Sequence, residues 1–154
     1  MNKGIPLIKR FEGLRLKAYL CPSNKPTIGF GSCFYENGSK VQLGDVITID
    51  RADKLLFNTV AEFEKQVDTV VTSTINANQL GALTSFAFNV GMGNFRRSTL
   101  LRLVNANPNN PAIRTEFMKW TRANNQVLKG LVTRRQAEAD LYFTPIIGNN
   151  PTNK

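Results

Sequence analysis

The 154-residue chain has no histidine and only two cysteines, Cys21 and Cys33. Without histidine, a Ser-His-Asp or Cys-His hydrolase, an HExxH zinc enzyme and a histidine general base are excluded. Two cysteines cannot build a zinc site alone. The chain also has no P-loop motif, and the GFG run at 29–31 is too short for a dinucleotide fingerprint. We therefore expect no metal and no cofactor, and chemistry that depends on carboxylate, thiol, hydroxyl and water.

Long apolar runs are absent as well. No stretch reaches the length that would span a bilayer, and the N-terminal run MNKGIPLIKR lacks the apolar core of a signal peptide. We expect a protein made in the cytoplasm without a signal peptide and without stable membrane insertion.

Acidic residues are few, and the formal net charge is +9 with a sequence pI near 9.9. Such a balance permits a polyanionic partner. The basic residues are scattered, however, and no zinc-finger, ribonucleoprotein or basic-zipper pattern occurs. The charge therefore fits an anionic surface better than nucleic acid, although a basic surface can also serve solubility alone.

The most informative segment begins at Glu12. It follows Ile5 and Ile8 at helical spacing, which places a carboxyl on the same face as two apolar residues. Gly13 is suited to end that helix, so Glu12 falls in the last turn, where the helix dipole disfavours an anion. This placement suits a proton donor. The alternative interpretation is an ion-pair partner at a helix end.

A small sheet is predicted after this helix. Ala18–Cys21 and Thr27–Cys33 have strand character, with a turn between them and a hairpin turn at 36–39. Strand alternation would put Thr27 and Cys33 on one face with two glycines, and Ile28 and Phe30 on the other. A nearly bare backbone face beside a hydroxyl would leave room for a ligand.

Helices dominate the rest of the sequence. Asp50 is expected to cap the longest one, with apolar residues recurring at Leu56, Val60, Phe63, Val67 and Val70. Further helices are predicted for a periodic run with Leu80, Leu83, Ala87 and Val90, from Ser98 to about Asn105, from Pro111 through Trp120, and from Gly130 to Tyr142. A break is expected at Gly91-Met92-Gly93, and residues 146–154 are expected to form a polar tail.

Three runs carry a resemblance to a known family: RFEGLRLKAYLCPSNKPTIGFGS, NQLGALTSFAFNVGMGNFRRSTLLRLVN and LKGLVTRRQAEADLY. Over residues 3–143 the chain resembles the phage-type lysozymes of glycoside hydrolase family 24, the endolysins related to the T-even phage lysozyme. Many relatives have a histidine where this chain has Ser32. The resemblance and the pattern together predict an α+β, lysozyme-like catalytic domain over 1–145. Its β-lobe (about 14–48) would be joined by a linking helix (about 50–72) to a helical lobe (about 76–143).

The family signature is a glutamate, eight residues, an aspartate or cysteine, five residues and a threonine, which here are Glu12, Cys21 and Thr27. The resemblance implies that Glu12 is the general acid. Cys21 with Thr27 would hold or deprotonate a water, or attack the sugar directly. Taken singly, Cys21 is typical of a small buried filler and Thr27 of an ordinary strand residue.

Further site residues also follow from the resemblance. Phe88 and Asn89 in FNVG and Ser98 in FRRST would contact substrate, and Arg134 in GLVTRR would orient Glu12 through a charge-assisted hydrogen bond. The alternatives are helix core for Phe88 and helix capping for Ser98.

The predicted function is that of an endolysin. We expect a monomeric muramidase that hydrolyses the β-1,4 bond between N-acetylmuramic acid and N-acetylglucosamine in peptidoglycan. It would reach the cell wall after holin-type release. Two rivals remain. A lytic transglycosylase would use one acid and no water, giving 1,6-anhydro products. A non-catalytic envelope-binding protein would tolerate loss of Glu12.

Overall fold

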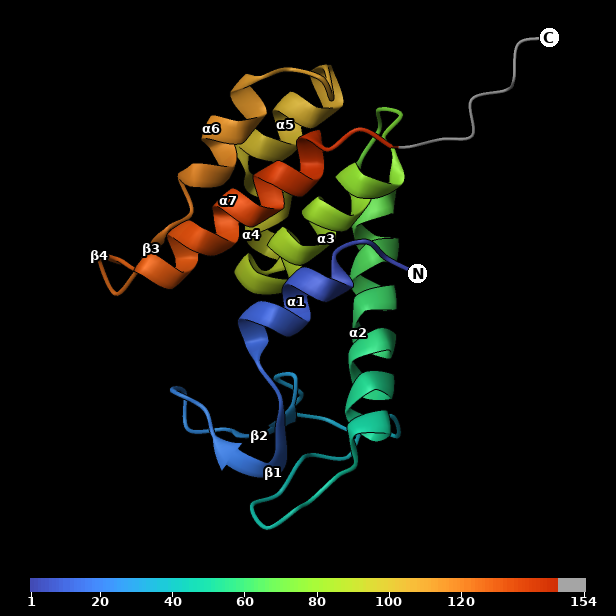
Figure 1. Ribbon diagram of the computed structural model, residues 1–154, viewed down its shortest axis with the longest axis vertical. Coiled ribbons are helices and arrows are strands. Elements are labelled where there is room, and N and C mark those ends of the chain that lie inside the picture. The colour runs from blue at the N-terminus through green and yellow to red at the C-terminus, as the bar shows by residue number, and fades with distance from the viewer. Residues whose placement is uncertain (147–154) are drawn as a thin grey trace, which may run out of the picture.

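A computed structural model of the protein describes residues 1–146, and it has two lobes joined by one long helix (Figure 1). The elements in chain order are α1 (Ile5–Glu12), β1 (Arg15–Leu20), β2 (Pro26–Gly29), α2 (Ile49–Val70), α3 (Ala77–Val90), α4 (Met92–Arg97), α5 (Thr99–Ala106), α6 (Ala112–Met118), β3 (Arg122–Ala123), β4 (Gln126–Val127) and α7 (Lys129–Phe143). The predicted α+β, two-lobe architecture is confirmed.

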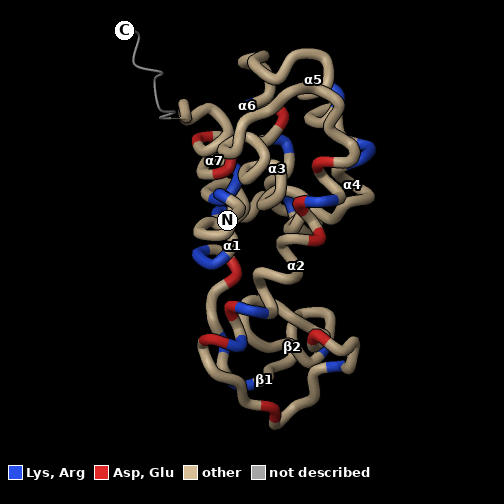
Figure 2. Tube along the Cα trace, turned by 90° about the vertical axis from the view of Figure 1, so that its right-hand side faces the viewer, with Lys and Arg blue, Asp and Glu red and all other residues tan. Residues whose placement is uncertain are grey.

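The long helix α2 is the link between the lobes (Figure 2). It begins after Thr48, whose hydroxyl accepts a hydrogen bond from the Arg51 amide at 3.2 Å. The prediction that Asp50 caps this helix was wrong, because Thr48 has the extended backbone of a cap while Asp50 lies in the first turn. There the Asp50 carboxylate is favourably placed near the positive end of the helix dipole.

The β-lobe contains less regular strand than its sequence predicts. β1 and β2 are antiparallel, but β2 ends at Gly29 and does not continue to Cys33. Gly29 and Gly31 adopt φ of 67° and 93°, so the chain reverses, and Ile28 exchanges two backbone hydrogen bonds with Ser32. Side chains 27 and 33 therefore approach each other across a tight turn, not along one strand face.

The helical lobe departs from prediction at two places. The Gly91-Met92-Gly93 break is followed at once by a short helix, α4, which the sequence pattern did not predict. α6 ends at Met118, before Trp120, and the two-residue strands β3 and β4 form a hairpin through Asn124 and Asn125, both with positive φ. Trp120 still packs against the helical core, with its ring 5.6 Å from that of Phe86.

Each lobe has its own apolar core. The larger lies among α3–α7, and its members are Val67, Ala82, Leu83, Phe86, Ala87, Met92, Phe95, Leu100, Leu101, Val104, Ile113, Phe117, Ala139 and Tyr142. The smaller joins α1 and the N-terminal half of α2 to the β-lobe, through Ile5, Ile8, Ala18, Ile28, Phe30, Val41, Ile47, Ala52, Leu55, Leu56 and Val60. α2 thus contributes to both cores.

Helix α1 lies at the junction of the lobes (Figure 1). It packs against α3 and α7 of the helical lobe, while Ile5 and Ile8 belong to the smaller core. Lys9 pairs with Asp53 of α2 at 2.8 Å. The Gly13 amide closes the helix by donating to the Lys9 carbonyl, so Glu12 is in the last turn, as expected.

The predicted polar tail, 146–154, falls outside the described residues except for Ile146, which is half exposed. Across residues 1–146, no helix is long and apolar enough to cross a membrane.

Candidate active site

Glu12 lies at the waist between the lobes, with its side chain 25% exposed. Its Oε1 accepts a hydrogen bond of 2.8 Å from Nη1 of Arg134, whose own side chain is 4% exposed. Its Oε2 faces Gly31 of the β-lobe, where a β-carbon in place of the glycine hydrogen would lie 3.5 Å from this oxygen. One oxygen of the carboxylate is therefore held by the helical lobe, while the other faces the β-lobe across the cleft.

Arg134 is itself held from behind by α3 and α7. Its Nη2 donates to the Ser85 carbonyl at 3.2 Å, and its Nε donates to Glu138 at 3.3 Å. The Ser85 hydroxyl donates to the same Glu138 oxygen at 2.6 Å. Arg135 lies against the other Glu138 oxygen at 2.9 Å. The guanidinium that contacts Glu12 is thus fixed by a buried polar cluster.

Burial dominates the electrostatics of that cluster. It raises the pKa of Glu138 against the opposing attraction of the two arginines, and it lowers the pKa of Arg135 to about 10. Sequence reasoning missed Glu138 and Ser85. The available signal was that Glu138 follows Arg134 and Arg135 at i+4 and i+3 on a helix face that continues to buried Ala139 and Tyr142.

Cys21 and Thr27 flank the turn at the end of the β1–β2 hairpin. The Cys21 thiol is 3.1 Å from the Ser23 hydroxyl. Hydrogen bonds, foremost that with Ser23 and then the backbone at Lys25, lower the Cys21 pKa to about 7. The buried Thr27 hydroxyl donates to the Lys25 carbonyl at 2.9 Å and lies 3.6 Å from the Cys33 sulfur. Both cysteines are free thiols.

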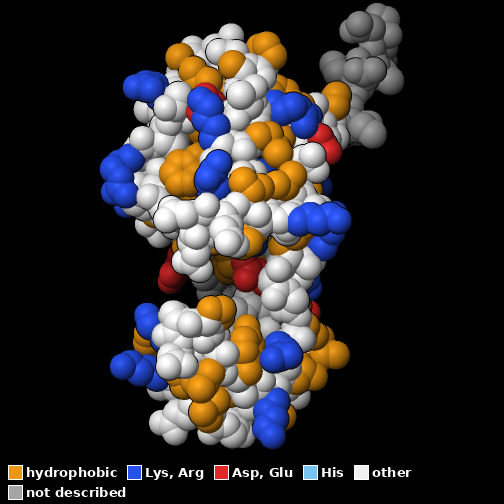
Figure 3. Space-filling view, turned by 90° about the vertical axis from the view of Figure 1, so that its left-hand side faces the viewer, with side chains coloured by type: hydrophobic (Ala, Val, Ile, Leu, Met, Phe, Trp, Pro, Cys, Tyr) orange, Lys and Arg blue, Asp and Glu red, His pale blue; other side chains and the backbone are white. Residues whose placement is uncertain are grey.

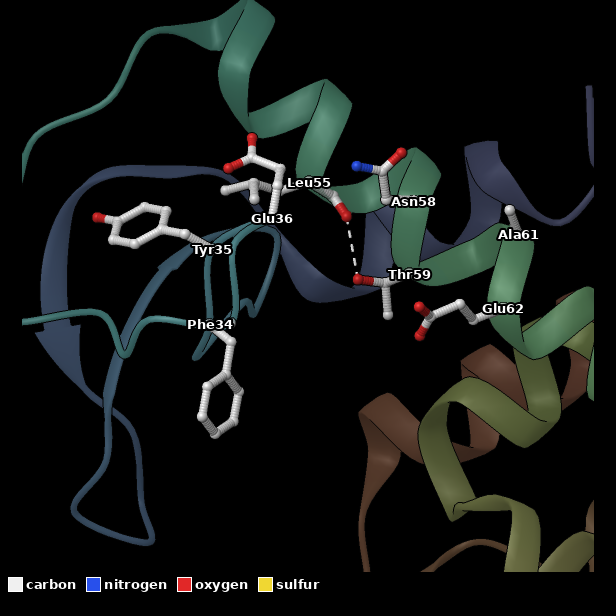
Figure 4. A pocket seen from close by; sticks show the side chains of 9 residues that line it. Phe34, Tyr35, Glu36, Leu55, Asn58, Thr59, Ala61 and Glu62 are labelled. Carbon is white, nitrogen blue, oxygen red and sulfur yellow. Dashed lines mark hydrogen bonds between the residues drawn. The ribbon is translucent and has the colours of Figure 1, made fainter.

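Two connected hollows extend from this region along the waist, which Figure 3 shows as a narrowing with exposed acidic side chains. The smaller, about 220 Å³, is lined by Gly31, Ser32, Cys33, Phe34, Leu56, Thr59 and Phe88. The larger, about 620 Å³, shares Phe34 and Thr59 with it and adds Tyr35, Glu36, Gly38, Leu55, Asn58, Ala61 and Glu62. In Figure 4, the α2 side chains and the Phe34 ring face this hollow from opposite sides.

The other predicted site residues are divided between two places. Phe88 lines the smaller hollow together with Gly31, and Asn89 accepts a 2.6 Å hydrogen bond from Arg135 of the buried cluster. Ser98 lies elsewhere, on the helical lobe. Its hydroxyl caps α5 by accepting from the Leu101 amide at 3.0 Å and donates to the Phe95 carbonyl at 2.7 Å. It lines a separate surface hollow of the helical lobe.

A two-lobe α+β fold with a carboxyl at the waist, and a thiol and hydroxyl on the small lobe, defines the class: the lysozyme fold. The family model described as "Phage lysozyme" matches residues 9–138, and the chain belongs to that family.

Individual relatives agree with this membership. The chain is 44% identical to the endolysin of Bacillus phage B103 over 143 residues, covering 92% of the chain and 52% of the relative. It is 40% identical to the endolysin of Acyrthosiphon pisum secondary endosymbiont phage 1, covering 92% of the chain and 95% of the relative. Among solved structures, the endolysin of Escherichia coli O157:H7 phage FAHEc1 superposes with a TM-score of 0.85 at 31% identity, covering 93% and 92% of the two chains. The chain thus spans about half the length of the B103 relative and nearly all of the other two.

Proposed function

We propose that the protein is a muramidase that hydrolyses the β-1,4 bond between N-acetylmuramic acid and N-acetylglucosamine in peptidoglycan. The observation that carries the proposal is the position of Glu12, which is partly exposed at the waist with one oxygen fixed by Arg134 at 2.8 Å. A carboxyl held in one orientation beside an open cleft can deliver a proton to the leaving oxygen of a glycosidic bond.

In this proposal, Cys21 and Thr27 bind and deprotonate the water that attacks the sugar. A thiol whose pKa is near 7 is about half thiolate at neutral pH, and the thiolate can take a proton from water. The Thr27 hydroxyl gives its own hydrogen to the Lys25 carbonyl and can accept one from the Cys33 thiol, which leaves one lone pair to accept a hydrogen from that water. Family resemblance favours inversion of the sugar configuration, with this water attacking from the far face.

The hollows beyond Gly31 provide a path for the glycan strand. Phe34 is 56% exposed where the two hollows meet, and an exposed aromatic ring is suited to stacking on a sugar face. Phe88 forms the opposite wall, while Asn58 and Thr59 of α2 offer polar groups to sugar hydroxyls. A neutral polymer would therefore meet apolar contacts and polar groups together along the cleft.

The place of action that we propose is the bacterial cell wall, where endolysins act. A basic protein of +9 would be attracted to the anionic envelope. Synthesis in the host cytoplasm and release by a separate holin-type factor stay predictions from the family resemblance, as do the monomeric state and the absence of a nucleic-acid partner.

The deciding experiment is mass spectrometry of purified peptidoglycan after digestion. A hydrolase gives muropeptides with reducing ends, whereas a lytic transglycosylase gives 1,6-anhydro ends that are lighter by one water. The groups around Cys21 favour hydrolysis, since a transglycosylase has no need of a water-activating thiol. Anhydro products would replace this proposal with the transglycosylase, and binding of sacculi without cleavage would replace it with an envelope-binding protein.

A further inference from the structure

Arg134 is shared by two carboxylates of different character. One is partly exposed Glu12, at 2.8 Å from Nη1, and the other is fully buried Glu138, at 3.3 Å from Nε. Glu138 in turn lies 2.9 Å from Arg135, whose Nη2 donates to Asn89 at 2.6 Å. The four charged groups alternate in sign, from the candidate general acid into the interior of the helical lobe.

The elements packed around Glu138 bring few other charges to it. On α7, only Arg134 and Arg135 pair with it. α3 offers the Ser85 hydroxyl, and the sequence Ala77–Val90 contains no ionisable side chain. α6 carries Arg114 and Glu116, which pair with Asp140 and Lys119 at 2.8 and 2.6 Å. α1 contacts Arg134 through the charged Glu12 and the uncharged Phe11 ring.

The other two cations of α1 make their contacts elsewhere, so the charge balance around Glu12 depends on this buried cluster. Lys9 is paired with Asp53 at 2.8 Å, and the guanidinium of Arg10 lies 4.8 Å from the centre of the Phe11 ring. Among the described residues, Arg134 is the one cation in salt-bridge contact with Glu12.

We propose that Glu138 is a positioning residue for the reaction: it holds Arg134 against Glu12 and, by balancing the two buried arginines, allows Glu12 to keep the proton that it donates. The inference rests on the proposed role of Glu12 as the general acid. Arg134 has to orient this carboxyl without drawing the proton from it, because an adjacent uncompensated cation favours the carboxylate form. The Glu138 carboxylate meets both requirements, because the two guanidiniums and the Ser85 hydroxyl that lie against its oxygens favour its ionised form against the burial that raises its pKa.

The proposal makes opposite predictions for two substitutions in one cluster. Glu138→Gln keeps the side-chain shape and removes the charge that faces both guanidiniums, so the uncompensated Arg134 should favour the carboxylate form of Glu12. Arg135→Met removes a positive charge, so the Glu12 carboxyl should titrate at higher pH. The double variant restores the charge balance, and its titration should return close to that of the wild type. Carbon-13 NMR of the glutamate side-chain carboxyls as a function of pH measures all three.

Activity should follow in the same variants. We expect Glu138→Gln to lower kcat on soluble glycan fragments by about tenfold to a hundredfold, with KM changed by less than about threefold, since the loss lies in the orientation and proton content of the acid. The matched control is Glu116→Gln, which removes another buried carboxyl from a helix packed on α7. It should lower the melting temperature while leaving kcat and the Glu12 titration unchanged.

A purely structural role would make different predictions. Glu138→Gln and Arg135→Met would then both lower stability without opposite shifts, and the double variant would be the worst of the three. That outcome would overturn the proposal. If Glu138→Gln does not fold, Arg135→Met and the double variant still decide it through the sign of their shifts. Full activity of Glu12→Gln would instead overturn the role of Glu12 itself, so the two failures are distinguishable.

Discussion

The two lobes hold their candidate catalytic groups by different means. In the helical lobe, Arg134 is nearly inaccessible and is fixed by Ser85 and Glu138. In the β-lobe, Cys21 and Thr27 depend on turn hydrogen bonds: Asn24, with φ of 62°, donates to the Cys21 carbonyl, and the Thr27 hydroxyl donates to that of Lys25. Glu12 is thus oriented by a buried cluster, whereas Cys21 and Thr27 are oriented by a surface turn.

The two lobes also differ in how completely they bury large apolar side chains. Residues 14–48 expose five large apolar side chains, namely Leu14, Leu20, Phe34, Leu43 and Val46. Residues 76–143 expose only Val127 and Leu128, both beside the β3–β4 hairpin. Because less apolar surface is buried in the β-lobe, it should open locally at lower free energy than the helical lobe. Substitutions in the β-lobe should therefore affect catalysis before global stability.

Removing the acid should give the largest effect. Glu12→Gln keeps the shape of the side chain but cannot deliver a proton, so lytic activity should fall by roughly a hundredfold to ten-thousandfold with the fold intact. Turbidity of permeabilised Gram-negative cells measures this loss, and Glu64→Gln on the long helix is a matched control. Retention of more than about a tenth of the activity would remove Glu12 from the mechanism.

Substitutions of Cys21 test the β-lobe part of the candidate site. In a Cys33→Ser background, Cys21→Ser should be severely impaired, since a hydroxyl does not ionise near neutral pH, whereas Cys21→Asp should recover much of the activity as the commoner family residue. The Asp variant should also resist alkylating reagents. If Cys21→Ala lyses cells as well as the wild type, Cys21 is a packing residue and the site consists of Glu12 and Thr27.

A matched pair of core substitutions compares the lobes directly. Ile28 and Ile113 are both fully buried, one beside Thr27 and one in the helical core. Each Ile→Ala change should lower the free energy of unfolding by about 2–5 kcal/mol, measured by urea titration. At a temperature where both variants are folded, Ile28→Ala should lose more specific activity. Equal activities would show that the β-lobe holds Thr27 as firmly as the helical lobe holds its own residues.

The Cys21 thiol should show its lowered pKa in its reactivity. In the Cys33→Ser background, the rate of alkylation by iodoacetamide should reach half its maximum at pH about 7, because the thiolate is the reacting species. Ser23→Ala removes the largest cause of the shift, so the midpoint should move upward. A midpoint at the ordinary thiol value in the parent protein would contradict the hydrogen bonding of this turn.

The smallest effect concerns charge. Residues 76–143 contain nine Lys and Arg against three Asp and Glu, whereas residues 14–48 contain four against two. Binding to sacculi should therefore weaken with salt above physiological strength, where the Debye length is below about 8 Å, while cleavage of a short neutral oligosaccharide changes little. Arg102→Gln should reduce this salt dependence more than Lys17→Gln. Equal salt sensitivity on both substrates would argue against attraction to the envelope.

Local patterns in the sequence were sufficient to predict most helices and the position of Glu12. Helical periodicity located α2 to within two residues at each end and found the C-terminal ends of α1 and α3, because each helix has an apolar stripe and an identifiable terminus. The same local rules missed α4, since Gly91 and Gly93 indicate a turn although Gly91 immediately precedes the helix. They also extended β2 past Gly29, because alternation persists through a turn that only the glycine φ angles reveal.

The candidate site was predictable only in part, for a related reason. The spacing of Glu12, Cys21 and Thr27 is a sequence property, so resemblance could identify it. The cluster behind Arg134 depends on contacts between residues far apart in the chain, such as Ser85 with Glu138. From sequence alone, Glu138 has the i+4 spacing of an ordinary surface ion pair. Its complete burial follows from how α7 packs on α3, which no local pattern specifies.

The contact between Glu12 and Arg134 joins residues 122 positions apart. Synthesis proceeds from the N-terminus, so the ribosome completes α1 and the whole β-lobe well before α7 exists. A nascent chain that ends before α7 has Cys21 and Thr27 within its finished portion but no guanidinium to orient Glu12. The acid becomes positioned only when the last helix docks onto the first. The order of biosynthesis therefore delays assembly of the candidate site until α7 has been synthesised.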